Sequence, residues 1–543
     1  MTTGRSWVPR DTGIQALILL VALGVFSWGV NVPSVWRDET VTLGMGRRSV
    51  PDIVKAVHNH DLVHGLYYLL AHVVMVAVSG LTSDLLAAGR AMAVVAMAAA
   101  AVVLFRLGRE LAGRGTGVLA AAVFIGSPLI SRYAQEARSY AFVVLGATTA
   151  THLLVLATHR TISPGAGGKV YGRRTWPTWL AYGVVLVATA ITNLMVSTLL
   201  VAHLVYVLAF ARPALKLWTG IVTVSLVPIG GFAYEASLQS DQIAWIKRPT
   251  TADLQEFFLS EFATWWVFVL IAVIFVAGLA LRTLSGDPGG TDVAPAYGHP
   301  ERAVEAVVLG VAWCVLPVLT LWSASFVHPI WVPRYALFTT PGTTLAAAGA
   351  VALLRRPSRP AAAPDGDPRP GALRWVHVAA SGLMVAAVVL LGIPAQAQVR
   401  GPVGHHEDLR GALDYLTTHS RTGDSILFMP AYLRQTQVAL PEIFVGLRDP
   451  LLGEEAVASG DISGHDVPKE QFAARLRVSP RIWVLSGPPD QAANGPDAVK
   501  MAVLTQDYRA VSAVHLTWWN ATLYVRKGTV RKGTPTGAPP ANR

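Results

Sequence analysis

Long apolar runs alternate with short polar stretches over the first three quarters of the chain. Two of these runs, Ala91–Phe105 and Gly183–Phe210, contain no Asp, Glu, Lys or Arg. A helix of about 20 apolar residues matches the roughly 30 Å thickness of a bilayer's hydrocarbon core. The pattern predicts twelve apolar helical segments, near residues 13–30, 63–80, 86–105, 115–131, 141–158, 177–194, 195–211, 217–234, 263–281, 303–325, 334–354 and 375–394.

The basic residues in the short loops indicate which segments cross a membrane. Lys and Arg accumulate in cytoplasmic loops, so an even number of crossings should separate any two basic loops. Three segments lie between Arg10 and Arg106, which breaks this rule. The segment 63–80 is short and contains His64 and His72, which suits a helix lying at the interface. We therefore predict eleven crossings of the plasma membrane, with a cytoplasmic N-terminus and an extracytoplasmic C-terminus.

The chain changes character after about Val399, where charges and Gly/Pro turns appear throughout. Short β-rich runs follow, and a helical stretch, Asp408–His419, precedes them. These alternating elements predict a small α/β domain outside the membrane. The β-rich runs are Ser425–Met429, Arg481–Leu485 and Ala521–Val525. The predicted domains are 1–395 in the membrane, with an outer loop at 31–85, then 396–528 as the extracytoplasmic α/β domain and 529–543 as a disordered tail.

Composition agrees with a polytopic α-helical membrane protein. Only 14% of the 543 residues are charged, whereas soluble domains carry roughly 25%. The net charge of +11 would suggest a nucleic-acid partner in a soluble protein, but the cations lie mostly in short loops between apolar runs, so nucleic acid is excluded as a partner. The single cysteine, Cys314, cannot form an internal disulfide and does not identify a redox compartment.

Polar residues able to do acid–base chemistry gather in the predicted outer loops. The pair Asp38–Glu39 follows the first apolar segment, and adjacent acids beside a membrane are costly unless they are paired or functional. The alternative is a solvated pair or a helix cap. The same loop contains His58, His60 and His64, which could bind a divalent ion, but their spacing fits no defined motif. We therefore leave a metal site open.

These motifs, in this order, resemble the GT-C superfamily of membrane glycosyltransferases. The resemblance is closest to the polyprenyl-phosphate-sugar-dependent group, which includes protein O-mannosyltransferases and the aminoarabinose transferases of lipid A. It covers about residues 10–395. The sequence departs from the family's His-Pro-Pro-Leu pattern at Gly65 and Leu66, and it has Glu136 where an Asp is frequent. The matching motifs are Asp38–Glu39, His64-Gly-Leu-Tyr-Tyr-Leu69, Leu107-Gly-Arg-Glu-Leu111, the polar loop Arg132–Tyr140 and Pro333-Arg-Tyr335.

The resemblance implies direct, inverting transfer of a sugar, with mannose or a pentose expected, from a polyprenyl-phosphate donor to a hydroxyl of an envelope glycan, lipid or protein on the outer face. Asp38 is the first choice for the general base and Glu39 the second. Cations near the leaving phosphate stabilise its charge, a role that falls to Arg334 and Arg138, with Tyr335 beside them. No particular cofactor is indicated, and a divalent cation is left open. The remaining substrate-binding candidates are Asp61, His64, Tyr67, Arg132, Gln135 and Glu136.

Two rival classes remain open at this point. A lipid-linked sugar transporter or flippase would place ionisable residues within its spans and often contains inverted repeats. The apolar segments here contain few ionisable residues, and the sequence shows no internal repeat. A non-catalytic assembly protein that displays its outer domain is the third class. The abundance of Ala, Gly, Val and Arg over Lys indicates a GC-rich bacterial genome.

Overall fold

The computed structural model describes residues 9–162, 175–284, 300–354, 370–488 and 495–528. The chain divides into two compact units. The first unit contains Met1–Pro33 and Val57–Gly404, and the second contains Ser34–Ala56 and His405–Arg543. The C-terminal segment thus forms one unit with part of the predicted outer loop, a grouping that the apolar pattern does not predict. The predicted disordered tail, 529–543, lies outside the described residues.

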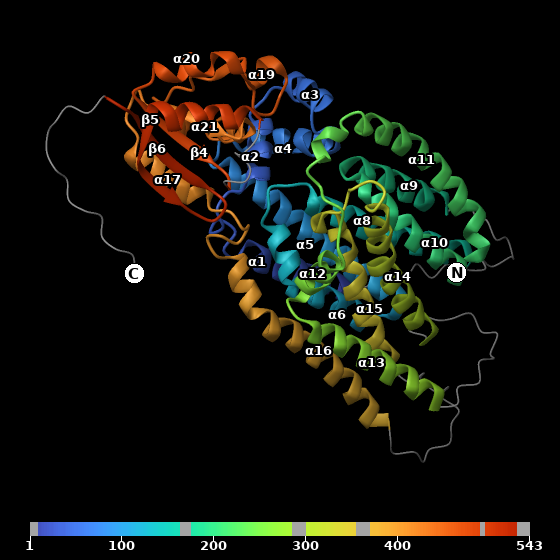
Figure 1. The fold of residues 1–543 in the computed structure, drawn as a ribbon. Helices are drawn as coiled ribbons and strands as arrows, with labels where there is room; N and C mark the ends of the chain where they lie inside the picture. Colours follow the sequence, from blue (N-terminus) through green and yellow to red (C-terminus); the bar gives the residue numbers. More distant parts are fainter. Residues whose placement is uncertain (1–8, 163–174, 285–299, 355–369, 489–494, 529–543) are drawn as a thin grey trace, which may run out of the picture. The chain divides into compact units, whose positions relative to one another are not determined.

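The first unit is helical (Figure 1). Six of its helices are long and apolar enough to cross a membrane, or up to eight if each of two bent pairs is one span. This confirms the predicted polytopic α-helical class, whereas the number of eleven crossings stays a prediction. Its helices are α1 (Pro9–Ser27), α4 (Gly65–Val78), α5 (Leu85–Ala112), α6 (Arg114–Gly126), α7 (Pro128–Ala134), α8 (Tyr140–Ile162), α9 (Trp176–Thr192), α10 (Leu199–Phe210), α11 (Leu215–Ser237), α12 (Thr251–Phe262), α13 (Trp265–Leu284), α14 (Pro300–Ala324), α15 (Thr340–Leu353) and α16 (Pro370–Val399), with short 3₁₀ turns η1 (Leu62–His64), η2 (Leu194–Thr198), η3 (Arg212–Ala214), η4 (Ser240–Ile243) and η5 (Pro333–Thr339).

Small residues allow the helices of the first unit to approach closely. A Cβ atom on Gly108 of α5 would lie 2.9 Å from the Cα of Gly117 in α6, and one on Gly342 of α15 would lie 2.8 Å from the backbone nitrogen of Cys314 in α14. Close packing of this kind replaces the hydrophobic effect as the main attraction between helices in lipid. In the span that joins η5 to α15, every residue from Ala336 to Leu353 is buried, whereas Pro333 is exposed and Arg334 and Tyr335 are half-buried at its start.

The second unit contains a four-stranded sheet with the order β1-β4-β6-β5. Figure 1 labels its strands β4, β5 and β6. Strands β1 and β4 are parallel and the other pairs are antiparallel. Leu427, Ile482 and Leu504 are fully buried in its core. The strands are β1 (Ser425–Met429), β2 (Leu452–Glu454), β3 (His465–Asp466), β4 (Arg481–Ser486), β5 (Tyr508–His515) and β6 (Asn520–Arg526), and the helices are α2 (Arg37–Gly46), α3 (Val50–Asn59, which crosses into the first unit), α17 (Leu409–His419), α18 (Gln435–Ala439), α19 (Ala456–Ser459), α20 (Phe472–Arg477) and α21 (Gly495–Asp507), with turns η6 (Ala431–Arg434), η7 (Pro441–Phe444) and η8 (Lys469–Gln471).

The predicted α/β character of the C-terminal segment is confirmed. The three β-rich runs become β1, β4 and β6, and the predicted helix Asp408–His419 becomes α17. Asp408 is the N-cap of that helix, because its carboxylate accepts a hydrogen bond from the backbone nitrogen of Gly411 at 2.9 Å. Buried aliphatic runs of five or six residues are typical of strands in the centre of such a sheet.

Helix α4 supplies a direct test of the predicted topology. The loop charges predict that the apolar stretch Leu62–Val78 lies at the interface and does not cross, so the exposed Ser83 should lie outside. We expect Ser83→Cys, in a Cys314→Ala background, to react with a membrane-impermeant maleimide on intact cells. Ile162→Cys, on the predicted cytoplasmic side, is the control that should react only after permeabilisation. Protection of Ser83→Cys until permeabilisation would contradict the eleven-crossing topology.

Candidate functional site

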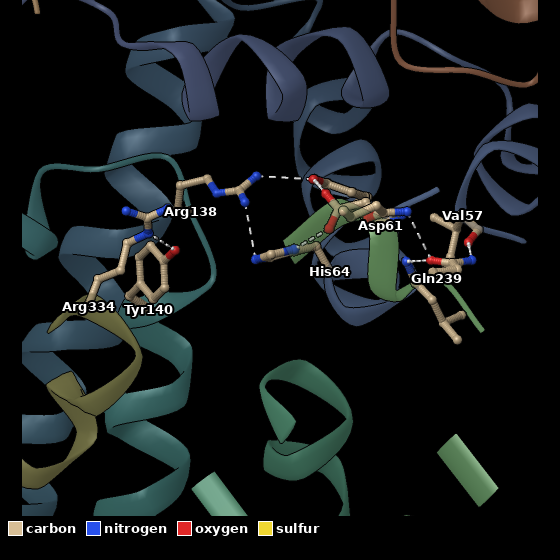
Figure 2. Close-up of polar contacts among 10 residues, drawn as sticks. Val57, Asp61, His64, Arg138, Tyr140, Gln239 and Arg334 are labelled. Atoms are coloured by element: carbon tan, nitrogen blue, oxygen red, sulfur yellow. Dashed lines mark hydrogen bonds and ion pairs between the residues drawn. The ribbon is translucent and has the colours of Figure 1, made fainter. Parts of the chain in front are cut away.

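Two glutamines fix the loop that leads into α4. The backbone nitrogen of Asp61 donates to Oε1 of Gln242 at 2.9 Å, and that of Leu62 donates to Oε1 of Gln239 at 3.0 Å. Nε2 of Gln239 donates in turn to the carbonyl of Val57 at 3.1 Å, as Figure 2 shows. Asp61 has φ = 63°, in the left-handed region that Asp tolerates better than most residues. These bonds therefore hold Asp61 in one orientation at the start of η1.

Asp61 begins a hydrogen-bonded network, the Asp61–Arg138 network, which consists of Asp61, His64, Tyr68 and Arg138 (Figure 2). Nδ1 of His64 lies 2.6 Å from Oδ1 of Asp61, and Nε2 of His64 lies 3.1 Å from a terminal nitrogen of Arg138. The hydroxyl of Tyr68 donates to Asp61 and accepts from Arg138 at 3.0 Å. A guanidinium only donates, so Nε2 of His64 accepts and its proton lies on Nδ1. The network thus orients Arg138 through His64.

The pKa of Asp61 is lowered by this network. Burial by itself raises the pKa, but the neighbouring His64, Arg138 and Tyr68 outweigh it and favour the carboxylate. Because the pKa is lower in the folded state, the charged carboxylate stabilises the fold above the ordinary aspartate pKa of about 3.9. That stabilisation is lost as the pH falls through the lowered value.

We therefore expect Asp61→Asn to destabilise the protein at pH 7, and the difference from the wild-type protein to shrink as the pH falls through the lowered pKa of Asp61. An asparagine offers one acceptor where donors from His64 and Tyr68 both arrive, which costs roughly 1–3 kcal/mol at neutral pH. Unfolding temperatures of the two proteins across this pH range measure the difference. Asp52→Asn is the control, since the carboxylate of Asp52 accepts a hydrogen bond from the hydroxyl of the nearby Ser49 at an exposed helix start. A difference that grows on acidification would contradict the assignment.

The second predicted phosphate-binding arginine, Arg334, lies in η5. Its Nε donates to the hydroxyl of Tyr140 at 2.9 Å. Its guanidinium carbon lies 5.6 Å from the ring centre of Tyr335 and 5.8 Å from that of Trp245. Tyr140 follows Arg138 by two residues, so the structure brings both predicted arginines to one region of the first unit (Figure 2). Neither Tyr140 nor Trp245 was a sequence candidate.

Three other candidates lie in α7 and in the loop between α7 and α8. The amide nitrogen of Gln135 donates to the carbonyls of Phe26 and Trp28, at 2.8 Å each, so this fully buried side chain holds the end of α1. Glu136 is fully buried as well. Arg132 is half-buried beside the ring of its neighbour Tyr133. The loop is thus a buried structure and not a solvated one.

Tyr67 lies in a different setting, against an apolar groove. Its ring is buried and lies 5.8 Å from the ring of Phe142 in α8. The groove has a volume of about 420 Å³ and runs between α4, α8 and α9. It is lined by Leu66, Tyr67, Leu70, Phe142, Leu145, Gly146, Thr149, Val185, Ala188, Thr189 and Thr192. Because Tyr68 of the Asp61–Arg138 network is the next residue, the groove begins beside that network.

The acid pair Asp38–Glu39 belongs to the second unit, at the start of α2. Glu39 is fully buried, and its carboxylate accepts a hydrogen bond from the backbone nitrogen of Trp36 at 3.3 Å. It also lies 3.8 Å from Nδ1 of His405. Glu39 is therefore a helix cap, one of the alternatives that the sequence leaves open. Asp38 is only half-buried, which favours it over Glu39 for contact with a substrate.

Arg37, next to Asp38, is bound by residues of the C-terminal segment, which sequence reasoning missed. Its Nε donates to Oε1 of Glu407 at 2.6 Å, and its guanidinium carbon lies 3.9 Å from the ring centre of Trp518. Nε2 of Gln435 donates to its carbonyl at 2.9 Å. The ion pair raises the pKa of Arg37 although burial opposes this. No motif signals this pairing, because the residues are hundreds of positions apart.

The predicted histidines do not assemble a metal site. Across the ranges that the structure describes, no three His, Cys, Asp or Glu side chains lie close enough together to hold a metal ion. His58 is exposed, and His64 is bonded to Asp61 and Arg138. The structure thus provides no ligand set around which to argue for a divalent cation.

The fold is shared with known membrane proteins. By sequence, neither a protein-family model nor a curated protein matches the chain. By structure, it is similar to ArnT from Cupriavidus metallidurans bound to undecaprenyl phosphate, with a TM-score of 0.55 and 12% identity over 95% of this chain and 99% of that chain. The apo state of that ArnT gives a TM-score of 0.54 and 14% identity, over 94% of this chain and 98% of that chain. AglB, the archaeal oligosaccharyltransferase from Archaeoglobus fulgidus, gives a TM-score of 0.46 and 12% identity, over 97% of this chain and 76% of that chain. The likeness to ArnT confirms the predicted GT-C fold.

Proposed function

We propose that the chain is a membrane glycosyltransferase, which moves a sugar from a polyprenyl-phosphate donor to an acceptor hydroxyl on the outer face of the plasma membrane. The observation that carries the proposal is the near full-length likeness to ArnT, a protein whose structure contains undecaprenyl phosphate. The motifs that resemble GT-C transferases lie where the structure has polar, buried networks. Mannose or a pentose is the sugar that we propose, and an envelope glycan, lipid or protein is the acceptor.

Asp38 is the proposed general base. The acceptor oxygen attacks the anomeric carbon, the bond from that carbon to the phosphate oxygen breaks, and the configuration inverts. The hydroxyl proton must leave as the new bond forms, and a positioned carboxylate accelerates such a step by roughly 10²- to 10⁴-fold. The half-buried position of Asp38 at the start of α2 supports this role. Glu39 supports it indirectly, as the cap of the same helix.

Arg138 and Arg334 are proposed to bind the donor phosphate. A guanidinium offers paired donors that match phosphate oxygens, and its charge stabilises the phosphate as it leaves. Asp61 and His64 orient Arg138, while Tyr140 and the ring of Tyr335 flank Arg334. This arrangement supports a site for an anion.

The remaining candidates are proposed to shape the donor site. The apolar groove beside Tyr67 suits the first isoprene units of a lipid carrier, since it is lined mostly by aliphatic and aromatic side chains. Gln135 and Glu136 belong to the buried loop that carries Arg138, and Arg132 lies in α7 just before it. The bonds of Gln135 to the end of α1 support a role in keeping that loop in place.

The experiment that tests the proposal uses the purified protein in liposomes with radiolabelled decaprenyl-phosphate mannose or decaprenyl-phosphate arabinose. A glycosyltransferase releases decaprenyl phosphate and moves the label to an envelope acceptor. A transporter moves the intact lipid-linked sugar across the bilayer and cleaves nothing. Absence of label transfer from both donors, together with translocation of the uncleaved lipid, would replace our proposal with the transporter.

A further inference from the structure

We infer that the C-terminal segment positions the candidate base, through a set of contacts that we call the Arg37 cluster: Arg37, Glu407, Gln435, Trp518 and Trp519. The inference rests on the proposed function, since it concerns the Asp38 that we assign as the base. It makes Glu407 and Trp518 positioning residues for a reaction in which they touch neither the sugar nor the phosphate.

Glu407 supplies the first contact, and both of its carboxylate oxygens take part. Oε1 accepts from Nε of Arg37 at 2.6 Å, and Oε2 accepts from the backbone nitrogen of Arg37 at 3.2 Å. Nε1 of Trp519 also donates to Oε2, at 3.1 Å. Glu407 is 3% exposed. A carboxylate at this place binds an N–H group of the first turn of α2, where the helix dipole favours negative charge.

Trp518 supplies the second contact, at a cost in backbone conformation. It lies in the turn between β5 and β6 with φ = 72°, a left-handed value that a bulky side chain rarely adopts. Glycine would fit this turn without strain. The indole lies under the guanidinium of Arg37 at 3.9 Å, a geometry that favours a cation–π interaction. Strain that persists at such a position is typical of functional sites.

The third contact completes the restraint on the residue next to Asp38. Gln435 donates to the carbonyl of Arg37 at 2.9 Å. The backbone nitrogen, the backbone carbonyl and the side chain of Arg37 are therefore each bound by the C-terminal segment. The peptide that carries Asp38 begins at that carbonyl, so its direction is set by the same bonds. A displacement of about 1 Å at a reacting group can cost roughly a hundredfold in rate.

Glu407→Gln is the decisive variant, and the chain offers a matched control. Asp424 is a buried carboxylate of the same unit that accepts from Nε of Arg481 at 2.7 Å and from Nε1 of Trp483 at 3.1 Å. Like Glu407, it is a carboxylate that accepts hydrogen bonds from an arginine and from a tryptophan, but it does not bind α2. We expect Glu407→Gln to lower kcat roughly tenfold with an unchanged KM for the donor, and Asp424→Asn to lose thermal stability while kcat per folded molecule stays normal.

Two variants of Trp518 distinguish an effect on the position of Asp38 from an effect on stability. Trp518→Gly relieves the left-handed strain but removes the ring beneath Arg37, so kcat should fall roughly two- to fivefold, the worth of a partly exposed cation–π contact. Trp518→Phe keeps an aromatic face and should recover most of that loss. Equal activity of the glycine and phenylalanine variants would argue against the role of the ring.

Hydrogen exchange of the α2 amides gives a readout that does not depend on activity. Glu407→Gln should raise exchange across the first turn of α2, whereas Asp424→Asn should not. Unchanged exchange in Glu407→Gln, or a kcat loss equal to that of Asp424→Asn, would overturn the inference. Failure of the proposed function looks different, because the wild-type protein would then transfer no sugar and Asp38→Asn would change nothing.

Discussion

Asp38→Asn is expected to lower turnover roughly 10²- to 10⁴-fold while the protein still folds and inserts normally. Asparagine has almost the same shape as aspartate but cannot take the proton of the acceptor hydroxyl. Asp38 is half-buried and Arg37 beside it is held on three sides, so the substitution removes a charge without removing a packing contact. The donor KM should stay near its normal value, since the proposed phosphate ligands lie elsewhere in the sequence.

The rate of sugar transfer at saturating donor measures this effect. Glu39→Gln is the matched control, because it neutralises the adjacent acid, whose carboxylate caps α2. It should reduce thermal stability more than Asp38→Asn and turnover less. Near-normal turnover in Asp38→Asn would exclude Asp38 as the base, and a larger loss in Glu39→Gln would transfer the role to Glu39.

Arg334→Lys is expected to lower turnover roughly tenfold to a hundredfold although the positive charge is kept, as expected for one charged hydrogen bond lost from the transition state. Arg334 uses Nε to bind Tyr140. Lysine has one terminal nitrogen and cannot hold Tyr140 and present a pair of donors at once. Pro333 restricts the backbone before Arg334, so the guanidinium approaches from a fixed direction.

The alternative is that Arg334 is only an interface anchor, together with Trp331 and Tyr335. That role predicts normal kinetics in Arg334→Lys, because lysine snorkels as well as arginine. Arg212→Lys is the control for a boundary arginine, since Arg212 is exposed and binds the carbonyl of Leu208 in the preceding turn. Donor affinity and rate are measured for both variants, and wild-type values for Arg334→Lys would favour the anchor.

The apolar helices of the first unit and strands β1, β4 and β6 of the second were predicted, because each depends on a local pattern, whereas α12, β2, β3 and β5 were not predicted. Every one of the twelve apolar segments contains a helix, and β1 coincides with the predicted run Ser425–Met429. The break inside the segment 115–131 was not predicted. There α6 and α7 meet at 70°. The side chain of Ser127 accepts a hydrogen bond from the backbone nitrogen of Ile130, and Pro128 begins the next helix. A serine followed by a proline is typical of the start of a helix, so this pair could have predicted the break.

The site was predictable only in part. The acid pair, Arg138 and Arg334 could be selected as candidates because charged residues beside a membrane are costly and because the motifs follow one another in the order of the family that they resemble; their roles stay predictions. Their partners were not predictable. Gln239 and Gln242, which hold the Asp61 loop, are ordinary polar residues of a loop nearly 180 positions away. Such contacts depend on the packing of helices, for which a single sequence contains no periodic signal.

The position of α2 in the second unit has a consequence for the order in which the protein is made. Arg37 and Glu407 are separated by 370 residues, which a ribosome needs roughly 20–75 s to synthesise. During that time the segment with Asp38 lacks the partners that hold its first turn. Translation that stops before Glu407 leaves a helical bundle in which the segment with Asp38, the proposed general base, cannot take its final conformation. Completion of the chain is therefore a prerequisite for assembly of the base, so truncated products should be inserted but inert.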